Sequence, residues 1–311
     1  MSAVPMSEPI RVATRRSPLA LAQSSLVAER ITAITGRPVE LVHTVTQGDL
    51  DSSPLTSIGG AGVFVAAVRQ AVIDGHADVA VHSLKDLPTA ACEGIVVAAV
   101  PEREDPRDAL CSHGASLAEL PAGARIGTGS PRRGAQLNIR RPDCQVVDLR
   151  GNVDTRLAHL DSDLDAVLLA AAGLRRLGRT GAVTEYLDPE VVLPAPGQGA
   201  LAVEVRSDDE ELNVALAQLD DAATRAAVTA ERSLLAALDA GCSAPVGAYA
   251  EVTEPGFWAP EIFLRGGVFA DAKAVRMSVT GPVAAAEELG RELADQLLAS
   301  GAAGLLSESS L

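Results

Sequence analysis

Arginine is concentrated in one stretch of the chain. Between positions 125 and 156 there are seven arginines and three acids, whereas the whole chain has a formal net charge of -15. A guanidinium group forms paired hydrogen bonds with carboxylates and phosphates. This concentration in an acidic protein predicts a binding site for a small polyanion. The alternative is a solvated helix face with local ion pairs.

Two glycine turns place several of these arginines directly after expected strands. Gly127–Arg133 follows a strand expected at 124–126, and Arg150–Arg156 follows a strand expected at 144–149. Each segment opens a helix. Glycines and hydroxyl side chains at a strand-to-helix turn leave backbone N–H groups available beside the positive end of the helix dipole. We therefore expect two anion sites at the carboxyl ends of strands.

A third segment with chemical potential is His82–Pro88, after a short buried strand expected at 79–82. Open α/β sheets bind their ligands at the carboxyl ends of strands. There the carboxylate of Asp86 can stabilise developing positive charge or transfer a proton. The alternative is that Lys85 and Asp86 form an ion pair that caps a helix.

Cysteine usage points to reduced thiols. The four cysteines are widely spaced and form no Cys-x-x-Cys pair, which disfavours a disulfide framework or a zinc site. Cys242 follows Gly241, which is expected to end a helix, so it lies on a tight turn. It is a candidate thiolate that forms a bond to carbon. The alternative, a small buried hydrophobe, fits Cys92, Cys111 and Cys144 better.

Composition and charge disfavour several classes of protein. Hydrophobic residues make up 47% of the chain and aromatic residues 2%, so neither wholesale disorder nor broad base-stacking platforms are expected. The acidic net charge disfavours nucleic acid and anionic lipid as partners. No apolar run is long enough for a membrane span and no secretory signal is expected, so we predict a cytoplasmic protein. The spacing of His76, His82 and His113 predicts no metal site.

The order of elements predicts an α/β protein. Strands are expected at 10–14, 39–46, 79–82, 95–100, 124–126, 144–149, 166–170 and 201–205, with helices at 19–35, 63–74, 134–140 and 153–160. Ser17 and Pro18 are typical of a helix start. Alternating strands and helices favour parallel sheets. Because the strand at 201–205 could return to the first sheet, we expect two lobes joined by two connections, with a ligand cleft between them.

The last third of the chain is expected to form a smaller α/β domain, with strands at 246–252, 262–268 and 274–279 before a helix at 284–298. The predicted domains are residues 9–101 with 199–219 (domain 1), 106–196 (domain 2) and 222–304 (domain 3). Interruptions rich in proline at 101–107 and 194–199 support the boundaries between the first two.

Six segments together resemble the hydroxymethylbilane synthase family, also called porphobilinogen deaminase. They are Ala13–Ala20, His82–Pro88, Gly127–Arg133, Arg150–Leu157, Pro196–Leu201 and Gly241–Gly247. The resemblance extends from about Ile10 to Leu298. It implies a monomeric transferase of haem biosynthesis, which joins four porphobilinogen molecules head to tail with loss of ammonia and releases hydroxymethylbilane by hydrolysis. It also implies three domains, of which the first two are like periplasmic binding proteins.

The resemblance further implies a covalent dipyrromethane cofactor, held by a thioether to Cys242, and Asp86 as the catalytic carboxylate. The implied cofactor-binding residues are Cys242, Lys85, Asp86, Thr128, Ser130, Arg132, Arg133, Arg150 and Gly151. The implied substrate-binding residues are Arg15, Ser17, Phe64, Arg150, Arg156, Arg176 and Gln198. Arginines suit this reaction because each porphobilinogen carries an acetate and a propionate, so the growing chain gains two negative charges per ring.

Two positions depart from the family pattern. Ala61 replaces the usual lysine of a Gly-Gly-Lys-Gly loop, and Gly129 lies where a hydroxyl residue is frequent. Three alternatives remain open at this stage: a non-catalytic two-lobed protein that binds small anions, a member of this fold that has lost activity, and a cysteine hydrolase. The last requires a base near Cys242, and no histidine is close in sequence.

Overall fold

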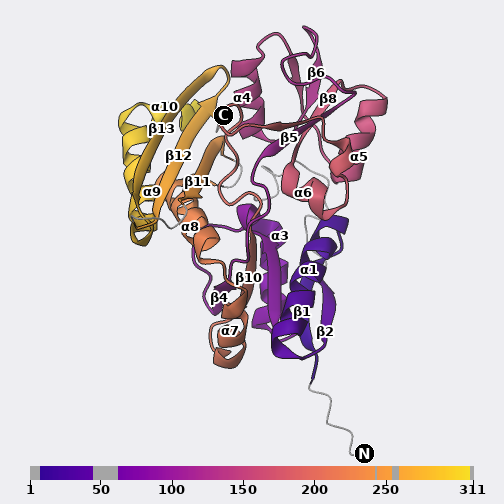
Figure 1. Ribbon diagram of the computed structural model, residues 1–311, viewed down its shortest axis with the longest axis vertical. Coiled ribbons are helices and arrows are strands. Elements are labelled where there is room, and N and C mark those ends of the chain that lie inside the picture. Colours follow the sequence, from indigo (N-terminus) through magenta and orange to yellow (C-terminus); the bar gives the residue numbers. More distant parts are fainter. Residues whose placement is uncertain (1–7, 45–61, 242–243, 254–258, 309–311) are drawn as a thin grey trace, which may run out of the picture. The chain divides into compact units, whose positions relative to one another are not determined.

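The computed structural model describes residues 8–44, 62–241, 244–253 and 259–308, with only the backbone of residues 62–64 and 308. Ala61, Cys242 and the side chain of Phe64 therefore lie outside the described residues. The chain divides into two compact units, one made of Met1–Arg103 with Ala200–Arg225 and the other of Glu104–Gly199 with Ala226–Leu311 (Figure 1). Three sheets lie within these units, and the α/β class is confirmed.

The first unit contains a five-stranded sheet with the order β2-β1-β3-β10-β4. The strands are β1 (Ile10–Arg15), β2 (Val39–Thr44), β3 (Val79–Ser83), β4 (Ile95–Ala99) and β10 (Leu201–Arg206). β10 returns to the first sheet as expected, where Leu201 pairs with Ser83 and Arg206 with Ile95. The expectation of a purely parallel sheet is wrong, because β10 enters antiparallel between β3 and β4.

Helices cover both faces of this first sheet. They are α1 (Pro18–Thr35), α3 (Gly62–Ile73) and α7 (Glu210–Leu216) with the short η1 (Leu84–Asp86) and η4 (Ala217–Leu219). Because successive strand residues point to opposite faces, Val12 packs in one core cluster with residues of α1 and α7, while Ala13 packs in another with residues of α3. The start of α1 is confirmed, since the Ser17 side chain accepts a hydrogen bond from Ala20 N at 3.3 Å.

The second sheet has the order β7-β6-β8-β5-β9. Its strands are β5 (Asp108–Ser112), β6 (Arg125–Gly127), β7 (Gln145–Val147), β8 (Ala166–Ala170) and β9 (Glu185–Leu187), and the helices are α4 (Pro131–Arg140), α5 (Val153–Ala158), α6 (Ala171–Arg176), η2 (His159–Asp161) and η3 (Thr180–Ala182). β6, β7 and β8 run parallel, but β5 and β9, which the sequence pattern did not indicate, make this sheet mixed as well.

Helix α4 begins three residues before the expected start at Gly134. Ser130 is its N-cap, accepting a hydrogen bond from Arg133 N, and Pro131 occupies the first turn, where the missing N–H has no cost. Arg132 and Arg133 therefore belong to the first turn of α4 and not to the preceding loop, and the helix fixes the direction of their side chains.

The third sheet, β11-β12-β13, is antiparallel and belongs to the second unit. Its strands are β11 (Val246–Val252), β12 (Glu261–Ala270) and β13 (Lys273–Pro282), and its helices are α8 (Ala222–Ala237), η5 (Val283–Ala285), α9 (Ala286–Ala299) and α10 (Ala302–Glu308). It adjoins the second sheet through Phe269, which packs with Ala135 of α4 and with Leu193. Arg276 adds a hydrogen bond of 2.6 Å from Nη2 to Gln136 Oε1.

Candidate active-site residues of the two units

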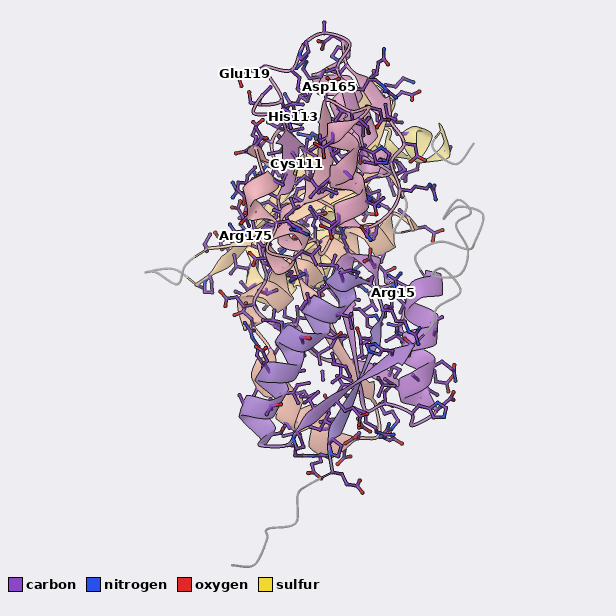
Figure 2. All side chains as sticks on the ribbon, turned by 90° about the vertical axis from the view of Figure 1, so that its right-hand side faces the viewer. Arg15, Cys111, His113, Glu119, Asp165 and Arg175 are labelled. Atoms are coloured by element: carbon purple, nitrogen blue, oxygen red, sulfur yellow. The ribbon has the colours of Figure 1, made fainter. Side chains whose placement is uncertain are left out.

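The predicted site residues of the first unit lie at one edge of its sheet. β1 and β3 are parallel neighbours, so Arg15 (Figure 2) and Ser83 both mark the carboxyl ends of their strands. Ser17 follows β1 directly, and the turn η1 after β3 carries Lys85 and Asp86. Lys85 is half-buried, whereas Asp86 is exposed. Within the described residues, the Asp86 carboxylate makes no hydrogen bond or ion pair.

The turn that carries Asp86 is fixed to two other elements. Gln23, buried on α1, donates from Nε2 to Ser83 Oγ at 2.7 Å. Leu84 N donates to Ala200 O at 3.0 Å, which joins η1 to the start of β10. An exposed carboxylate on an anchored turn is available to a ligand without first breaking an internal contact.

A buried ionic network lies just behind this turn. Glu204 on β10 accepts two hydrogen bonds from Arg69 of α3, at 2.9 and 2.6 Å, and its Oε2 lies 3.3 Å from His82 Nε2. Burial alone would raise the pKa of Glu204, but the hydrogen bonds and positive charge of Arg69 and His82 lower it to about 2. Glu204 was not among the predicted site residues. A single acid within the apolar strand Leu201–Val205 nevertheless indicates a buried charge that needs a partner.

In the second unit, three parallel strands bring the predicted anion loops to a common edge. Gly127 of β6 pairs with Val147 of β7 and with Val167 of β8. The loop after β6 carries Thr128 and Ser130, the loop after β7 carries Arg150 and Gly151, and α6 after β8 carries Arg176. Thr128 N also donates to Val147 O at 2.9 Å, so the first loop is bonded to the last residue of β7, directly before the second loop.

Arg132 and Arg133 project into the protein from α4 and share one buried carboxylate. Arg132 Nη1 lies 2.8 Å from Asp108 Oδ2, and Arg133 Nη2 lies 2.7 Å from Asp108 Oδ1. Gln198 donates to the same Oδ1 at 2.7 Å. All four side chains are buried. The structure therefore places Arg132, Arg133 and Gln198 around Asp108, a partner that the sequence analysis did not identify.

The Asp108 cluster retains an excess of positive charge. Burial alone would raise the pKa of Asp108, but the two guanidinium groups hold it well below its usual range, so the carboxylate is charged. Burial lowers the pKa of Arg132, and the charge of Asp108 opposes that effect. One carboxylate faces two arginines, which leaves one positive charge to be balanced at this end of the sheet.

Arg133, Arg150 and Arg156, which we call the arginine edge, affect one another electrostatically. Arg156 is half-buried on α5, and its Nε donates to Gly151 O at 2.8 Å. Burial lowers the pKa of Arg156, and the positive charges of Arg133 and Arg150 lower it further. Mutual repulsion of this kind favours binding of an anion, which would relieve it.

Arg176, at the same edge of the sheet, has a buried N–H group that makes no hydrogen bond among the described residues. Its Nη2 donates to Gly199 O at 2.6 Å, while its buried Nε has no hydrogen-bond partner among the described residues. Burial lowers the pKa of Arg176 to about 10, against the opposing charge of Glu104. A buried donor without a partner is costly, so an acceptor from a ligand would stabilise it.

Gly129 is explained by the close approach of the two loops. A Cβ atom built on Gly129 would lie 2.7 Å from Leu149 O and 3.4 Å from Asp148 Oδ1. A residue with a hydroxyl side chain, which is frequent at this position in the family that the sequence resembles, would require the backbone of the neighbouring loop to move. Gly199 is equally constrained, because its φ is +91° and a Cβ would lie 2.3 Å from Glu104 O.

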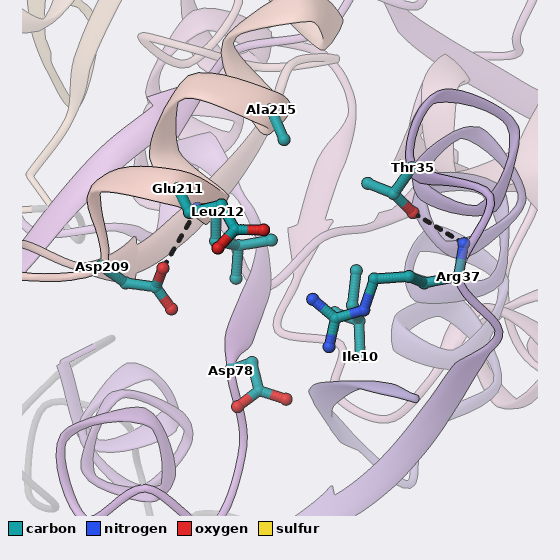
Figure 3. A pocket seen from close by; sticks show the side chains of 8 residues that line it. All are labelled: Ile10, Thr35, Arg37, Asp78, Asp209, Glu211, Leu212 and Ala215. Atoms are coloured by element: carbon teal, nitrogen blue, oxygen red, sulfur yellow. Dashed lines mark hydrogen bonds between the residues drawn. The ribbon is translucent and has the colours of Figure 1, made fainter. Parts of the chain in front are cut away.

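A cavity lies at the opposite edge of the first sheet and involves none of the predicted site residues. Its volume is about 330 Å³, and it opens near Ile10, the first residue of β1 (Figure 3). Its lining residues are Ile10, Thr35, Arg37, Asp78, Asp209, Glu211, Leu212 and Ala215. Asp78 is already paired with Arg11 at 2.7 Å, and Asp209 accepts from Leu212 N at the start of α7.

Two further features bear on the class of protein. No group of three or more His, Cys, Asp or Glu side chains in the described ranges could hold a metal ion. Among the helices of the described part of the chain, none is long and apolar enough to cross a bilayer. The geometry defines an α/β protein with arginine-rich loops at a sheet edge, an arrangement that suits small anionic ligands.

Comparison with known proteins assigns the chain to one family within this class. The family model "Porphobilinogen deaminase, dipyromethane cofactor binding domain" matches residues 10–214, and "Porphobilinogen deaminase, C-terminal domain" matches residues 225–299. Porphobilinogen deaminase 1 of Streptomyces coelicolor is 57% identical over 96% of this chain and 98% of its own length. Porphobilinogen deaminase of Nocardia farcinica is 53% identical over 99% of this chain and 91% of its own.

Among solved structures, the periplasmic VFT2 domain of Bordetella pertussis BvgS is similar, with 15% identity and a TM-score of 0.40 over 68% of this chain and 86% of that one. Lipoprotein Tp32 of Treponema pallidum has 13% identity and a TM-score of 0.43 over 68% of this chain and 90% of that one.

The chain belongs to the porphobilinogen deaminase family. It is a transferase of tetrapyrrole biosynthesis, which joins four porphobilinogen molecules with loss of ammonia and uses a dipyrromethane cofactor. The relatives thus favour this function over the non-catalytic anion-binding alternative.

Proposed function

We propose specific roles for the residues at the two sheet edges. In the second unit, Thr128, Ser130, Arg150, Gly151 and the Asp108-bound pair Arg132 and Arg133 would hold the dipyrromethane. The observation that supports this most is the arginine edge, where Arg133 and Arg150 lower the pKa of Arg156 and positive charge exceeds negative. Acetate and propionate groups supply the missing negative charge, so the residues present fit the cofactor.

Substrate carboxylates would be bound by Arg15 and Ser17 of the first unit and by Arg150, Arg156 and Arg176 of the second. A bound carboxylate would supply an acceptor for the buried Nε of Arg176 and would reduce the repulsion that Arg156 experiences from Arg133 and Arg150. Gln198 is a weaker candidate for direct contact, because its amide already donates to Asp108 and to Pro106 O at 2.7 and 2.8 Å. Its proposed role is to hold Asp108 and thereby the two arginines of α4.

Asp86 is proposed as the catalytic carboxylate. It is exposed and has no internal partner in the described part of the chain, so its charge is available to the substrate. As ammonia leaves porphobilinogen, positive charge develops on the pyrrole and its methylene carbon, and a nearby carboxylate stabilises that charge more strongly as water is excluded. The same oxygens can accept the pyrrole N–H. Lys85, on the same turn, is proposed to contact a carboxylate of the cofactor.

Cys242 is proposed as the residue that carries the cofactor. When bound, the dipyrromethane supplies the pyrrole carbon from which the product chain grows. A thioether suits a permanent anchor, because it resists hydrolysis and thiol exchange. The chain on both sides of position 242, α8 from Ala226 onward and all of β11, belongs to the same compact unit as the arginine edge. The buried Glu231 of α8 accepts from Gly197 N at 2.6 Å and from Ala250 N of β11 at 2.9 Å, which fixes that part of the unit.

We further propose that the protein acts as a monomer in the cytoplasm and that its domains are residues 9–101 with 199–219, 106–196 and 222–304. Phe64 is expected to contact the substrate, and with Ala61 in place of lysine the same loop has one cation fewer to offer the product carboxylates.

Ammonia release from porphobilinogen tests these roles. We expect Asp86→Asn to reduce kcat by about 100-fold or more, since an amide supplies neither the charge nor the proton acceptor. Because Asp86 is exposed, the unfolding temperature of the variant should match that of the wild type. Asp74→Asn, another exposed acid of the first unit, is the control and should keep full activity. Turnover by Asp86→Asn at the wild-type rate would remove Asp86 from the mechanism.

A further inference from the structure

Asp148 is an acid located between the two anion loops of the second unit. It follows β7 by one residue, and its side chain is 67% exposed. Asp148 Oδ2 lies 3.4 Å from Arg150 Nε, and Asp148 Oδ1 lies 3.4 Å from the position a Cβ on Gly129 would take. The carboxylate therefore faces Arg150 from one side and the loop that begins α4 from the other.

The same carboxylate acts on Arg156. Its negative charge raises the pKa of Arg156, in opposition to burial and to the charges of Arg133 and Arg150. Asp148 thus partly neutralises Arg150 and Arg156, whereas Arg133 is paired with Asp108. Because Gly129 has no side chain, the backbone at Leu149 approaches it closely, and Leu149 O lies 2.7 Å from the position of a Cβ there. This approach keeps Asp148 beside the loop of Thr128 and Ser130.

We propose that Asp148 sets the affinity of the site for its ligands, as an internal carboxylate that competes with the carboxylates of pyrrole ligands for Arg150 and Arg156. The proposal rests on the function proposed above for these arginines. Because both members of the Arg150–Asp148 pair are about half exposed or more, the contact is weak enough to be exchanged for a ligand carboxylate.

Competition of this kind has a function in a reaction whose product gains two negative charges per ring. Arginines without a competing acid would bind each added ring more tightly and slow the dissociation of the finished chain. A fixed carboxylate at the same edge lowers the affinity for every acidic ligand by a similar factor. It therefore favours release at the expense of a higher KM.

The direction of the effect separates this role from a positioning role. If Asp148 competes with ligands, its removal strengthens binding; if it holds Arg150 in the conformation that binds ligands, its removal weakens binding. The test compares Asp148→Asn with Asp154→Asn in the full-length holoenzyme. Asp154 is a matched control, because it is also partly exposed and its carboxylate pairs with Arg179 at 2.8 Å instead of with the arginine edge.

We expect Asp148→Asn to lower the KM for porphobilinogen by about two- to fivefold, the range for an exposed ion pair. Its kcat should be unchanged or lower, and its KM should rise more steeply with salt. Asp154→Asn should keep the wild-type KM. A second readout needs no turnover: the citrate concentration that gives half of the maximal rise in unfolding temperature should fall by a similar factor only in Asp148→Asn.

A KM and a citrate midpoint that are unchanged or raised in Asp148→Asn would overturn the inference. Arg150→Met distinguishes that failure from failure of the proposed function. If Arg150→Met raises the KM and the citrate midpoint while Asp148→Asn behaves like Asp154→Asn, only the role of Asp148 is wrong. If Arg150→Met also leaves both quantities unchanged, the arginine edge does not bind these ligands, and both proposals fail.

Discussion

At position 108 a single buried carboxylate holds two guanidinium groups and one amide. Removing one partner of a buried ion pair is far more damaging than replacing the whole group, because a charge remains without compensation. This carboxylate holds the side chains of Arg132 and Arg133 in position on α4. The positive charge of Arg133 in turn lowers the pKa of Arg156. Asp108 thus supports the proposed anion site without being part of its surface.

We predict that Asp108→Asn lowers the free energy of unfolding by about 3–5 kcal/mol, since two buried arginines lose their counter-charge. Urea unfolding followed by circular dichroism measures the difference. Asp143→Asn is the control, because Asp143 is 42% exposed in its pair with Arg141 and solvent screens the interaction, so this variant should be destabilised far less. Equal destabilisation by the two variants would contradict the account of Asp108.

Most residues of the candidate site could be predicted from their types and spacing in the sequence. The buried residues that hold their side chains in position could not. The glycine turns and arginines could be recognised because their chemistry is local. Asp108 could not, since its partners lie 24 and 25 positions away on α4 and 90 positions away at Gln198. A carboxylate that begins a short strand looks like a surface residue until its neighbours in the sheet are known.

On the scale of elements, Glu204 joins three parts of the first unit: β10, which carries it, α3 through Arg69, and β3 through His82. Its pKa of about 2 in the folded protein is below its ordinary value of 4.5. A depressed pKa means that the contribution to stability is complete above the ordinary value. That contribution is lost as the pH falls from about 5 toward 2.

We predict that Glu204→Gln is less stable than the wild type by about 3 kcal/mol at pH 7, and that the difference shrinks as the pH approaches 2. Urea midpoints at several pH values measure it. Glu29→Gln, at an exposed position of α1, serves as the control and should show no pH-dependent difference. A difference for Glu204→Gln that stays constant with pH would contradict the network.

The helix starts show where local signals succeed. Ser-Pro at 17–18 predicted the start of α1, because serine caps the helix and proline fits its first turn. The same pair at 130–131 begins α4, but the expected start was at Gly134. Two consecutive arginines resemble a solvent-exposed loop, whereas here they are buried against Asp108. The capping signal was the correct one.

On the scale of the whole molecule, the sequence predicted the α/β class and the return of β10, since both depend on alternating patterns and on chain order. Strand direction was predicted less well. β5, β9 and β10 run antiparallel to their neighbours, and only their long-range pairing shows it. β9 has three residues, too few for any period to be recognised.

Charge is distributed unevenly over the molecule. The chain has a net charge of -15, yet the edge of the second sheet carries an excess of arginine. A negative surface elsewhere repels unspecific polyanions, so the positive region is left for a small acidic ligand that reaches the loops. Under the roles proposed above, this contrast would allow an acidic protein to hold a product that becomes more negative with each ring.

The central claim is that the chain carries a dipyrromethane on Cys242 and extends it, with its acidic groups held by arginine. Intact-mass measurement of the purified protein tests this most directly. We predict a wild-type mass above the sequence mass by one dipyrromethane, and a Cys242→Ser variant with the mass of its sequence and no turnover. A fully active wild-type protein of unmodified mass, or a Cys242→Ser variant that retains the added mass, would contradict the account.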